Sequence, residues 1–515
     1  MSQTFYVKQN KNSCYGNSVS HISLVGMGLS PSSITGEDGV NALDEVISSI
    51  GGKHAVKVAI VGAAGVRTPQ LVEALWARAE ELVVTELALL DIDDRRLDLM
   101  ENVIRELPGI ESGCTKLTCT TDPRDALRGS DFVIFTIRVG NINSRVIDEQ
   151  IPLKYGVIGQ ETTGPGGFSM AMRTIPVMLE YVELIKEVAP RAWILNLTNP
   201  VGMITQAITE TGFTRIVGIC DSPTALFRDI ADAVRIPREE LWFEYFGINH
   251  LGWIRRILHQ RQDITQDVLN NDMVLLRHGS VMLDPDFIRA LGMIPNEYLM
   301  FYYEPRGIVE QLRKNRITRG GIIEGLNRKL FAELEKVAES REEWASLKVY
   351  QQYARAREDS YMKVETADLE HGTLINTLWE RSTGSPGRVE REPEGYAGIA
   401  LSVMESLTGR KPKVIVVNAI NEGAVDCLES QDIVELPCYV DSNGVHPIAV
   451  ARVPEASRGL LQAVKSYERL TIQASRTRAY ATALQALVAH PLVRDVKTAR
   501  AILDEYTGSY DWQLQ

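Results

Sequence analysis

The sequence predicts an α/β protein with a Rossmann-like, doubly wound parallel sheet and a second α+β, mainly helical C-terminal domain. A chain of 515 residues is too long for a single hydrophobic core and suits two domains. Short β-branched runs alternate with helical patterns over residues 56–219, which is typical of parallel sheets, and helical patterns dominate after about residue 250. We therefore expect an extension over residues 1–53, a Rossmann-like domain over 54–250 and a second domain over 251–515.

The predicted strands of the first domain are short apolar runs that end in small or polar residues. In chain order they are Val56–Gly62, Glu86–Leu90, Asp131–Ile137, Ala192–Leu197 and Ile216–Ile219, with helices predicted at Pro69–Glu81 and Leu97–Leu107. Ligands of such sheets bind at the carboxyl ends of the strands. The polar residues that follow the strands, such as Asp91, Asn199 and Asp221, are therefore candidate site residues.

The rest of the chain has weaker patterns. Residues 1–53 are rich in Asn, Ser and Gly and have only short apolar pieces, so we expect this extension to be loosely attached or partly ordered. Helical patterns cover Ser340–Arg357 and Ala449–Val488, and Val414–Asn418 with Ile433–Pro437 resemble paired strands.

Composition excludes several classes of protein. The net charge of -12 argues against general nucleic-acid binding, which needs clustered Lys and Arg. No apolar run approaches the ~20 residues needed to span a bilayer, and the first twenty residues lack the apolar region of a secretory signal. The six cysteines are scattered without a C-x-x-C pair. We expect a cytoplasmic protein without nucleic-acid or membrane partners.

The first strand leads into a loop that suits a dinucleotide. The loop residues are Gly62, Ala63, Ala64, Gly65, Val66 and Arg67. Small residues let the backbone approach a pyrophosphate, and the helix that follows presents free N–H groups to it. Asp91 ends the second strand 29 residues after Gly62, where a carboxylate binds the ribose hydroxyls of NAD and disfavours the extra phosphate of NADP. The alternative is an ordinary strand–turn–helix without a nucleotide.

Several segments together resemble glycoside hydrolase family 4, the NAD- and metal-dependent 6-phospho-glycosidases. They are Ile137–Gly140, Asp148–Thr162, Gly164–Gly167, Thr198–Pro200, Cys220–Pro223, Gly247–His250, Pro295–Leu299 and Val434–Cys438. The resemblance covers roughly residues 56–510 and leaves out the extension. The loop departs from the family pattern, because the family commonly has three glycines where this chain has Gly62, Ala63 and Ala64.

The resemblance implies a role for each matching residue. Cys220 and His250 would bind Mn²⁺ or another divalent metal, and Tyr298 would be the catalytic base. Asp221 would protonate the leaving oxygen, while Asn199, Arg145 and Arg319 would bind substrate, the two arginines at its 6-phosphate. The structural alternatives are a buried apolar cysteine, a core histidine, a packed tyrosine, a helix cap for Asp221 and solvated surface charges for the arginines.

The implied function is a glycosidase that hydrolyses a 6-phospho-glucoside by redox elimination. NAD would oxidise C3 of the sugar, Tyr298 would remove the C2 proton, the aglycone would leave, and water addition and re-reduction would follow. The substrate would be a phosphorylated disaccharide or glucoside of either anomer, and the enzyme a homodimer or homotetramer. The alternatives are a family 4 enzyme for unphosphorylated sugars (α-galactosidase or glucuronidase type), a lactate/malate-type dehydrogenase, and a nucleotide-sensing protein without catalysis.

Overall fold

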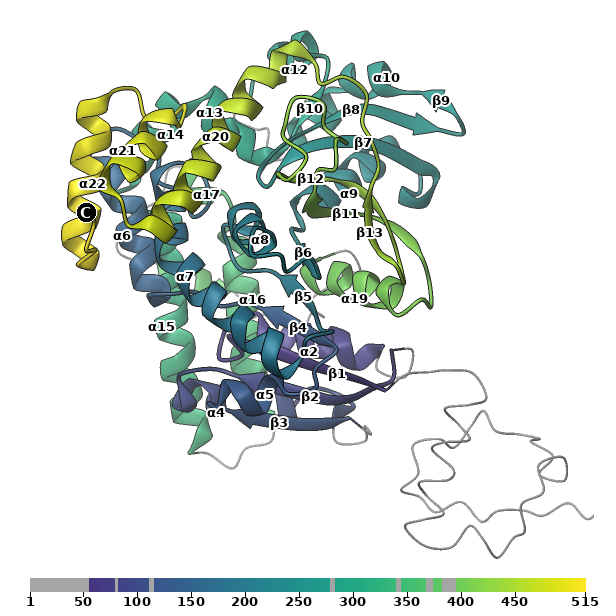
Figure 1. Ribbon diagram of the computed structural model, residues 1–515, viewed down its shortest axis with the longest axis vertical. Helices are drawn as coiled ribbons and strands as arrows, with labels where there is room; N and C mark the ends of the chain where they lie inside the picture. The colour runs from purple at the N-terminus through teal and green to yellow at the C-terminus, as the bar shows by residue number, and fades with distance from the viewer. Residues whose placement is uncertain are drawn as a thin grey trace, which may run out of the picture.

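The computed structural model describes residues 55–78, 82–110, 115–277, 283–339, 344–366, 374–381 and 395–515. The extension predicted at residues 1–53 lies outside the described residues. Figure 1 shows a large twisted sheet that crosses the molecule, with a smaller sheet and a group of helices beside it.

The large sheet has nine strands in the order β13-β12-β11-β6-β5-β4-β1-β2-β3. Six of them are mutually parallel and follow the Rossmann order 3-2-1-4-5-6, which confirms the predicted fold class. These six strands are β1 (Val56–Val61), β2 (Val84–Leu90), β3 (Lys116–Thr120), β4 (Phe132–Phe135), β5 (Trp193–Asn196) and β6 (Ile216–Gly218). The chain order reverses between β1 and β4, and such a reversal opens a crevice for a ligand at the carboxyl ends of the strands.

Three strands from the C-terminal half extend this sheet. They are β11 (Lys413–Ile420), β12 (Ile433–Asp441) and β13 (Gly444–Pro447), and all of them are antiparallel to their neighbours. β11 joins the parallel strands where Asn418 pairs with Gly218. The pairing predicted for the two later strands is therefore confirmed, and the sheet continues across the boundary expected at residue 250.

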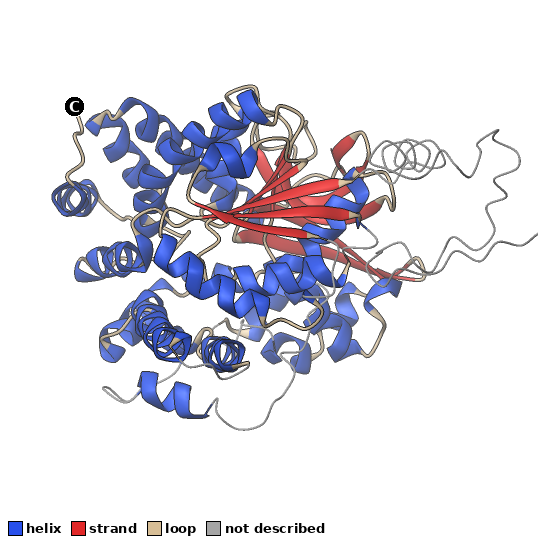
Figure 2. Cartoon of the chain, turned by 90° about the horizontal axis from the view of Figure 1, so that it is seen from below, coloured by secondary structure: helices blue, strands red, loops and turns tan. Residues whose placement is uncertain are grey.

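Helices cover both faces of the large sheet. Helices α2 (Thr68–Ala77) and α4 (Asp94–Arg105) contact α15 (Arg319–Ala338), α16 (Ala345–Asp359) and α19 (Tyr396–Leu407). A second group consists of α5 (Pro123–Leu127), α7 (Pro165–Val188), α8 (Val201–Thr209) and α20 (Glu455–Thr477). The N-terminal half of the chain also contains α6 (Asn141–Lys154) and α9 (Ser222–Val234). Figure 2 shows the strands gathered together with helices packed around them. This arrangement buries both faces of the parallel strands, which explains their continuous apolar runs.

A smaller antiparallel sheet follows the Rossmann strands. Its main hairpin is formed by β7 (Leu241–Ile248) and β8 (Leu251–His259), and short strands β9 (Gln262–Asp263) and β10 (Ile294–Pro295) pair with β8. The sequence did not predict this hairpin, because β7 is apolar except at Glu244 and Gly247 and so lacks the regular apolar–polar alternation of a half-exposed strand. The short elements around it are η4 (Arg238–Glu240), α10 (Thr265–Leu269), α11 (Asp272–Arg277), α12 (Pro285–Leu291), η6 (Glu297–Leu299) and α13 (Met300–Tyr303).

The remaining helices come from the C-terminal half. They are α14 (Pro305–Asn315), α15 (Arg319–Ala338), α16 (Ala345–Asp359), α17 (Lys363–Thr366), α18 (Leu374–Arg381), α19 (Tyr396–Leu407), α20 (Glu455–Thr477), α21 (Tyr480–Ala489) and α22 (Val496–Tyr510). The helical stretch predicted over Ala449–Val488 contains two helices, α20 and α21. The chain is not helical before Glu455, and Arg478 adopts a left-handed φ of 54° that ends α20 and starts a new direction. In the described ranges, no helix combines the length and apolar character needed to cross a membrane.

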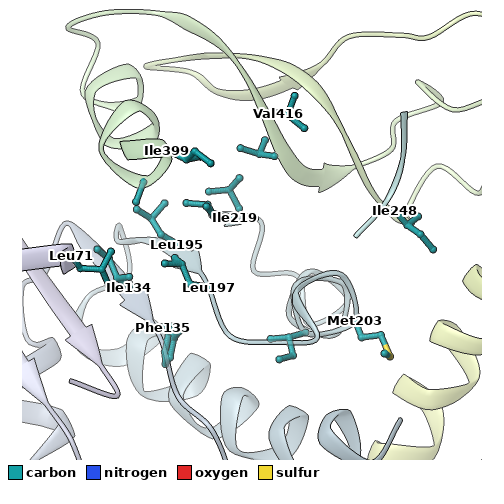
Figure 3. Close-up of a cluster of buried hydrophobic side chains, with 14 of the residues drawn as sticks. Leu71, Ile134, Phe135, Leu195, Leu197, Met203, Ile219, Ile248, Ile399 and Val416 are labelled. Atoms are coloured by element: carbon teal, nitrogen blue, oxygen red, sulfur yellow. The ribbon is translucent and has the colours of Figure 1, made fainter. Parts of the chain in front are cut away.

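One hydrophobic core joins the two halves of the chain. Figure 3 shows part of it, where Leu71 of α2 and Ile134 of β4 belong to the same buried cluster as Ile399 of α19 and Val416 of β11. Ile248, at the end of β7, belongs to it as well. Strands from both halves of the chain therefore pack into the same hydrophobic core.

A buried ion pair fixes α20 against the large sheet. The ammonium group of Lys465 is fully buried and contacts three oxygens: a Glu468 carboxylate oxygen at 2.5 Å, the Ile433 carbonyl at 2.8 Å and Gln206 Oε1 at 3.2 Å. Ile433 and Gln206 accept hydrogen bonds from it, and the Glu468 carboxylate supplies the opposite charge. These contacts connect α20 to β12 and α8.

Replacing this lysine tests the structural role of the pair. Lys465→Met should lower the free energy of unfolding by about 3–5 kcal/mol, because it leaves the Glu468 carboxylate buried without its cation. The matched control is Arg328→Met, which removes an exposed ion pair with Glu324 and should cost less than about 1 kcal/mol. Urea unfolding measures both, and equal small losses would contradict a stabilising role for Lys465.

Candidate active site

The loop after β1 has the close packing that a dinucleotide site needs. Gly62 has a left-handed φ of 92°, and a Cβ there would lie 2.9 Å from the backbone of Thr136 and Ile137. At Gly65 a Cβ would lie 2.8 Å from the carbonyl oxygen of Gly62. No side chain caps the N-terminus of α2, which begins at Thr68. The loop therefore presents backbone at the crevice between β1 and β4, as a pyrophosphate requires.

Asp91 ties the end of β2 to this loop. One carboxylate oxygen accepts the Ala64 N–H at 2.9 Å and the other accepts the Asp93 N–H at 3.1 Å. Burial raises the pKa of Asp91, and these two hydrogen bonds oppose the rise. The Asp91 carboxylate is thus held at the end of β2, the position predicted to bind the ribose hydroxyls of NAD.

The side chain of Arg67 contacts a residue far from the loop in the chain. Its guanidinium carbon lies 4.2 Å from the ring centroid of Tyr396, the first residue of α19. Burial alone would lower the pKa of Arg67, but attraction to Tyr396, Asp221 and Glu161 outweighs it and raises the pKa. We predicted Arg67 only as part of the nucleotide loop, and the structure places it next to the candidate acid as well.

Cys220 and His250, the predicted metal ligands, lie at the ends of two different sheets. Cys220 is a free, buried cysteine between β6 and α9. Its thiol pKa is raised by burial and by the nearby carboxylates of Glu435 and Asp221. His250 occupies the tight turn between β7 and β8 with a φ of 61°, a conformation that is costly for a residue with a Cβ. Backbone strain of this kind is common at functional sites.

His250 has a nitrogen that is free to bind a cation. Its Nδ1 is hydrogen-bonded to Thr162 Oγ1, and its Nε2 is buried with no hydrogen-bond partner in the described residues. Burial lowers the pKa of His250 to about 4, so the ring is neutral at pH 7. A neutral imidazole with a free lone pair and a buried thiol form a donor set that fits a transition metal.

Tyr298 stacks on His250. The two rings lie 3.6 Å apart between centroids and are tilted by only 4°. Burial raises the pKa of Tyr298 well above its ordinary value, and the carboxylate of Glu297 adds to the rise. The tyrosine is therefore protonated in this arrangement and can act as a base only with a neighbouring positive charge.

Hydrogen bonds join the segment of Tyr298 to residues that closely follow both predicted metal ligands. Asn296 Nδ2 donates to Ser222 Oγ at 2.7 Å, and Ser222 Oγ donates to a Glu297 carboxylate oxygen at 2.7 Å. The Asn296 N–H donates to the Gly252 carbonyl at 2.9 Å. Ser222 and Gly252 each lie two residues after a ligand, so these bonds fix the tyrosine relative to Cys220 and His250.

Asp221 is not a helix cap. Its side chain makes no capping hydrogen bond to α9, so this alternative is wrong. Burial raises the pKa of Asp221 to about 6, while Arg67 and a hydrogen bond from Tyr396 lower it. A carboxyl group near this value can carry a proton at neutral pH and donate it.

Asn199 has an open acceptor at the end of β5. Its Oδ1 is buried and has no hydrogen-bond partner in the described part of the chain. The neighbouring Asn196 instead supports the turn, since its Oδ1 accepts the Thr198 N–H at 3.0 Å. An amide oxygen held in this way suits a substrate hydroxyl.

The two predicted arginines lie together, and neither is a solvated surface charge. Arg145 is 5% exposed and donates to Glu149 at 2.7 Å and to Glu161 at 2.5 Å. Glu149 also accepts the N–H of Gly320 at 2.6 Å, which brings the start of α15 onto α6. This contact places Arg319, the first residue of α15, beside Arg145.

Arg319 has neutral hydrogen-bond partners and cationic neighbours. It donates to Ser360 Oγ and, at 3.2 Å, to the Arg357 carbonyl. No carboxylate in the described ranges lies within ion-pair distance of it. Burial lowers the pKa of Arg319 to about 10, and repulsion from Arg357 and Arg145 adds to the fall. A position at which burial and cationic neighbours disfavour a guanidinium charge is favourable for an anion.

The structure adds residues that the sequence did not identify as part of the site. Glu161 lies between Arg138 and Arg145, and its pKa is well below the ordinary value because these cations outweigh its burial. The Tyr361 hydroxyl donates to a Glu297 carboxylate oxygen at 3.4 Å, next to Tyr298. Tyr396 lies beside Asp221 and lowers its pKa. Glu161 lies within a recognised segment, whereas no local pattern marks Tyr361 or Tyr396.

Family models match most of the chain. Residues 57–236 match the family 4 glycosyl hydrolase model, and residues 245–493 match the model of the family 4 glycosyl hydrolase C-terminal domain.

Individual relatives match over nearly the same region. The chain is 30% identical over 455 residues to the 6-phospho-beta-glucosidase BglT of Thermotoga maritima, covering 87% of this chain and 97% of the relative. It is 30% identical over 481 residues to the maltose-6'-phosphate glucosidase of Bacillus subtilis, covering 88% and 95%. The crystal structure of a 6-phospho-alpha-glucosidase from gut microorganisms, in complex with NAD and Mn²⁺, superimposes with a TM-score of 0.73 at 25% identity, covering 88% and 98%. The chain belongs to family 4 of the glycosyl hydrolases.

Proposed function

We propose that the protein is an NAD- and divalent-metal-dependent 6-phospho-glucosidase. The observation that carries the proposal is the unpaired Nε2 of His250 beside the stacked ring of Tyr298, in a site that also contains Cys220. A metal cation bound by His250 would supply the positive charge next to Tyr298, and without that charge the tyrosine stays protonated. The names of the relatives, which include glucosidases for both anomers, support the substrate class and leave the anomer open.

The loop residues Gly62 to Arg67 and Asp91 would hold NAD, and Cys220 and His250 would hold Mn²⁺ or a similar ion. When bound, NAD would accept a hydride from the sugar and return it, and the metal would polarise the sugar oxygens that it binds. Tyr298 would remove the proton from C2 of the sugar. Asp221 would protonate the departing oxygen, and Asn199 Oδ1 would accept a sugar hydroxyl.

The arginines give the reason to expect a phosphorylated sugar. Arg145 is already neutralised by two glutamates, so it mainly holds α6 and the Glu161 segment in place. Arg319 has no ion-pair partner within the described residues, and its guanidinium can pair with a phosphate in a two-pronged contact. We propose that Arg319 provides most of the affinity for the 6-phosphate.

The substrate class is tested by comparing phosphorylated and free nitrophenyl glucosides. The wild-type enzyme with NAD and Mn²⁺ should hydrolyse the 6-phosphate form and not the free form, and EDTA should stop the reaction. Arg319→Met should raise KM for the phosphorylated substrate by about 10–100-fold, as expected for losing a charged hydrogen bond worth roughly 1.5–3 kcal/mol. Equal use of both glucosides by the wild type would favour an unphosphorylated substrate, and net formation of NADH would favour a dehydrogenase.

The base is tested by a substitution that keeps the stacked ring. Tyr298→Phe retains the contact with His250 but has no hydroxyl group, so exchange of a C2 deuteron of the substrate with solvent should fall by at least about 100-fold. Mn²⁺ affinity should stay within about threefold of the wild type, because Tyr298 is not a proposed ligand. Mass spectrometry of recovered substrate measures the exchange, and wild-type exchange in the variant would remove Tyr298 from this role.

The acid is tested through the leaving group. Asp221→Asn should slow hydrolysis of a disaccharide phosphate by about 100-fold or more, because a departing sugar oxygen is strongly basic and needs a proton. A nitrophenyl substrate, whose leaving oxygen is weakly basic, should be hydrolysed at nearly the wild-type rate. Values of kcat for the two substrates give the answer, and the same loss on both would argue against proton donation by Asp221.

A further inference from the structure

A chain of side-chain hydrogen bonds runs behind the His250 ring. Thr162 Oγ1 is hydrogen-bonded to His250 Nδ1 and lies 2.9 Å from Gln160 Oε1. Gln160 Oε1 also accepts two backbone N–H groups, from Thr162 at 2.7 Å and from Thr163 at 3.1 Å. Both backbone groups can only donate, so the atom that faces them is the amide oxygen of Gln160.

The positions of the protons follow from this arrangement. Gln160 Oε1 is an acceptor only, so the proton between it and Thr162 belongs to the Thr162 hydroxyl. Since that hydroxyl has a single proton, its oxygen can only accept at His250. His250 must therefore carry its proton on Nδ1, and its Nε2 is left with a lone pair that has no partner in the described residues.

We propose that Gln160 and Thr162 form a tautomer clamp, which keeps the proton of His250 on Nδ1 and leaves the Nε2 lone pair to bind the divalent cation. This inference rests on the proposed function, in which His250 is a metal ligand. Thr162 is a positioning residue, because it acts on the ion only through the histidine. An imidazole held in one tautomer and one orientation loses neither a proton nor rotational freedom when it binds a metal.

The loop that carries the clamp is built to stay in place. It folds back on the first turn of α7, where a Cβ on Gly166 would lie 2.3 Å from the Gln160 carbonyl oxygen and one on Gly167 would lie 2.4 Å from the Thr162 carbonyl oxygen. Glycine is thus required at both positions by the approach of the loop backbone. The Gln160 N–H also donates to the Thr163 carbonyl at 3.2 Å, which closes the turn.

The clamp also affects the catalytic base. Because the His250 ring lies parallel to Tyr298 at 3.6 Å, tilting the imidazole out of its plane would push against the tyrosine. Fixing the orientation of His250 through Thr162 therefore fixes the face on which Tyr298 rests. The Gln160–Thr162 pair thus positions a proposed metal ligand and the proposed base together.

The test compares three variants in the full-length protein. Thr162→Val keeps the shape of the side chain and removes the hydroxyl, Thr162→Ser keeps the hydroxyl, and Thr174→Val is the matched control. Thr174 is fully buried in α7, and its hydroxyl has no partner among the described residues. Electron paramagnetic resonance of free Mn²⁺ during titration measures Kd directly. Thr162→Val should raise Kd by about 10–100-fold, and the other two variants should stay near the wild type.

The tautomer is read separately in metal-free protein. Imidazole ¹⁵N shifts of histidine-labelled samples, assigned to His250 with a His250→Gln variant, should show protonated Nδ1 in the wild type and a population with protonated Nε2 in Thr162→Val. Unchanged shifts and unchanged Kd in Thr162→Val would overturn the clamp. Loss of affinity in Thr162→Ser as well would overturn it too, because a hydroxyl would then not suffice.

His250→Ala separates this inference from the proposed function. If the wild type binds Mn²⁺ and His250→Ala does not, the metal role of His250 stands whatever Thr162→Val shows. If His250→Ala binds Mn²⁺ as tightly as the wild type, the metal assignment itself fails. A melting temperature of Thr162→Val within a few degrees of that of Thr174→Val shows that a change in Kd does not reflect unfolding.

Discussion

The hydrogen bonds of Asn296, Ser222 and Glu297 are the contacts on which the rest of the site depends. They join the segment that carries Tyr298 to the strand end that carries Cys220. The three groups are buried, and a buried polar group that loses its partner costs free energy. Tyr298, the proposed base, can therefore not move away from Cys220, the proposed metal ligand, without breaking this network.

Burial gives the site its electrostatic character. It raises the pKa of Asp221 to about 6 and lowers the pKa of His250 to about 4, so each group is more easily neutral than in water. It also lowers the pKa of Arg319 to about 10. Charges that are poorly solvated by the protein interact strongly with a ligand that brings the opposite charge. A cation at His250 and an anion at Arg319 would thus both be bound in a setting with little competing water.

The C-terminal strands do more than widen the sheet. Glu435 of β12 accepts hydrogen bonds from Asn249 at 3.1 Å, Asn418 at 2.9 Å and Tyr245 at 2.9 Å. These partners lie on the turn before His250, on β11 and on β7. Burial raises the pKa of Glu435 to about 7, and the three donors oppose the rise. One side chain thus connects the large sheet to the small one at the site, which explains why strands so late in the chain belong to the same core.

The sequence alone determined the features that depend on local pattern. Short apolar runs that alternate with helical patterns predicted the parallel strands. The small residues from Gly62 to Gly65 predicted the dinucleotide loop. Similarity to known motifs pointed to Cys220, His250 and Tyr298. Only the tertiary structure decided how these parts meet. It placed the Arg67 guanidinium near Asp221 and paired β11 with β6. It also brought the Thr162 hydroxyl to His250, which lies 88 residues later in the chain. Contacts between such distant segments depend on packing and on which donor faces which acceptor, and neither leaves a period in the sequence.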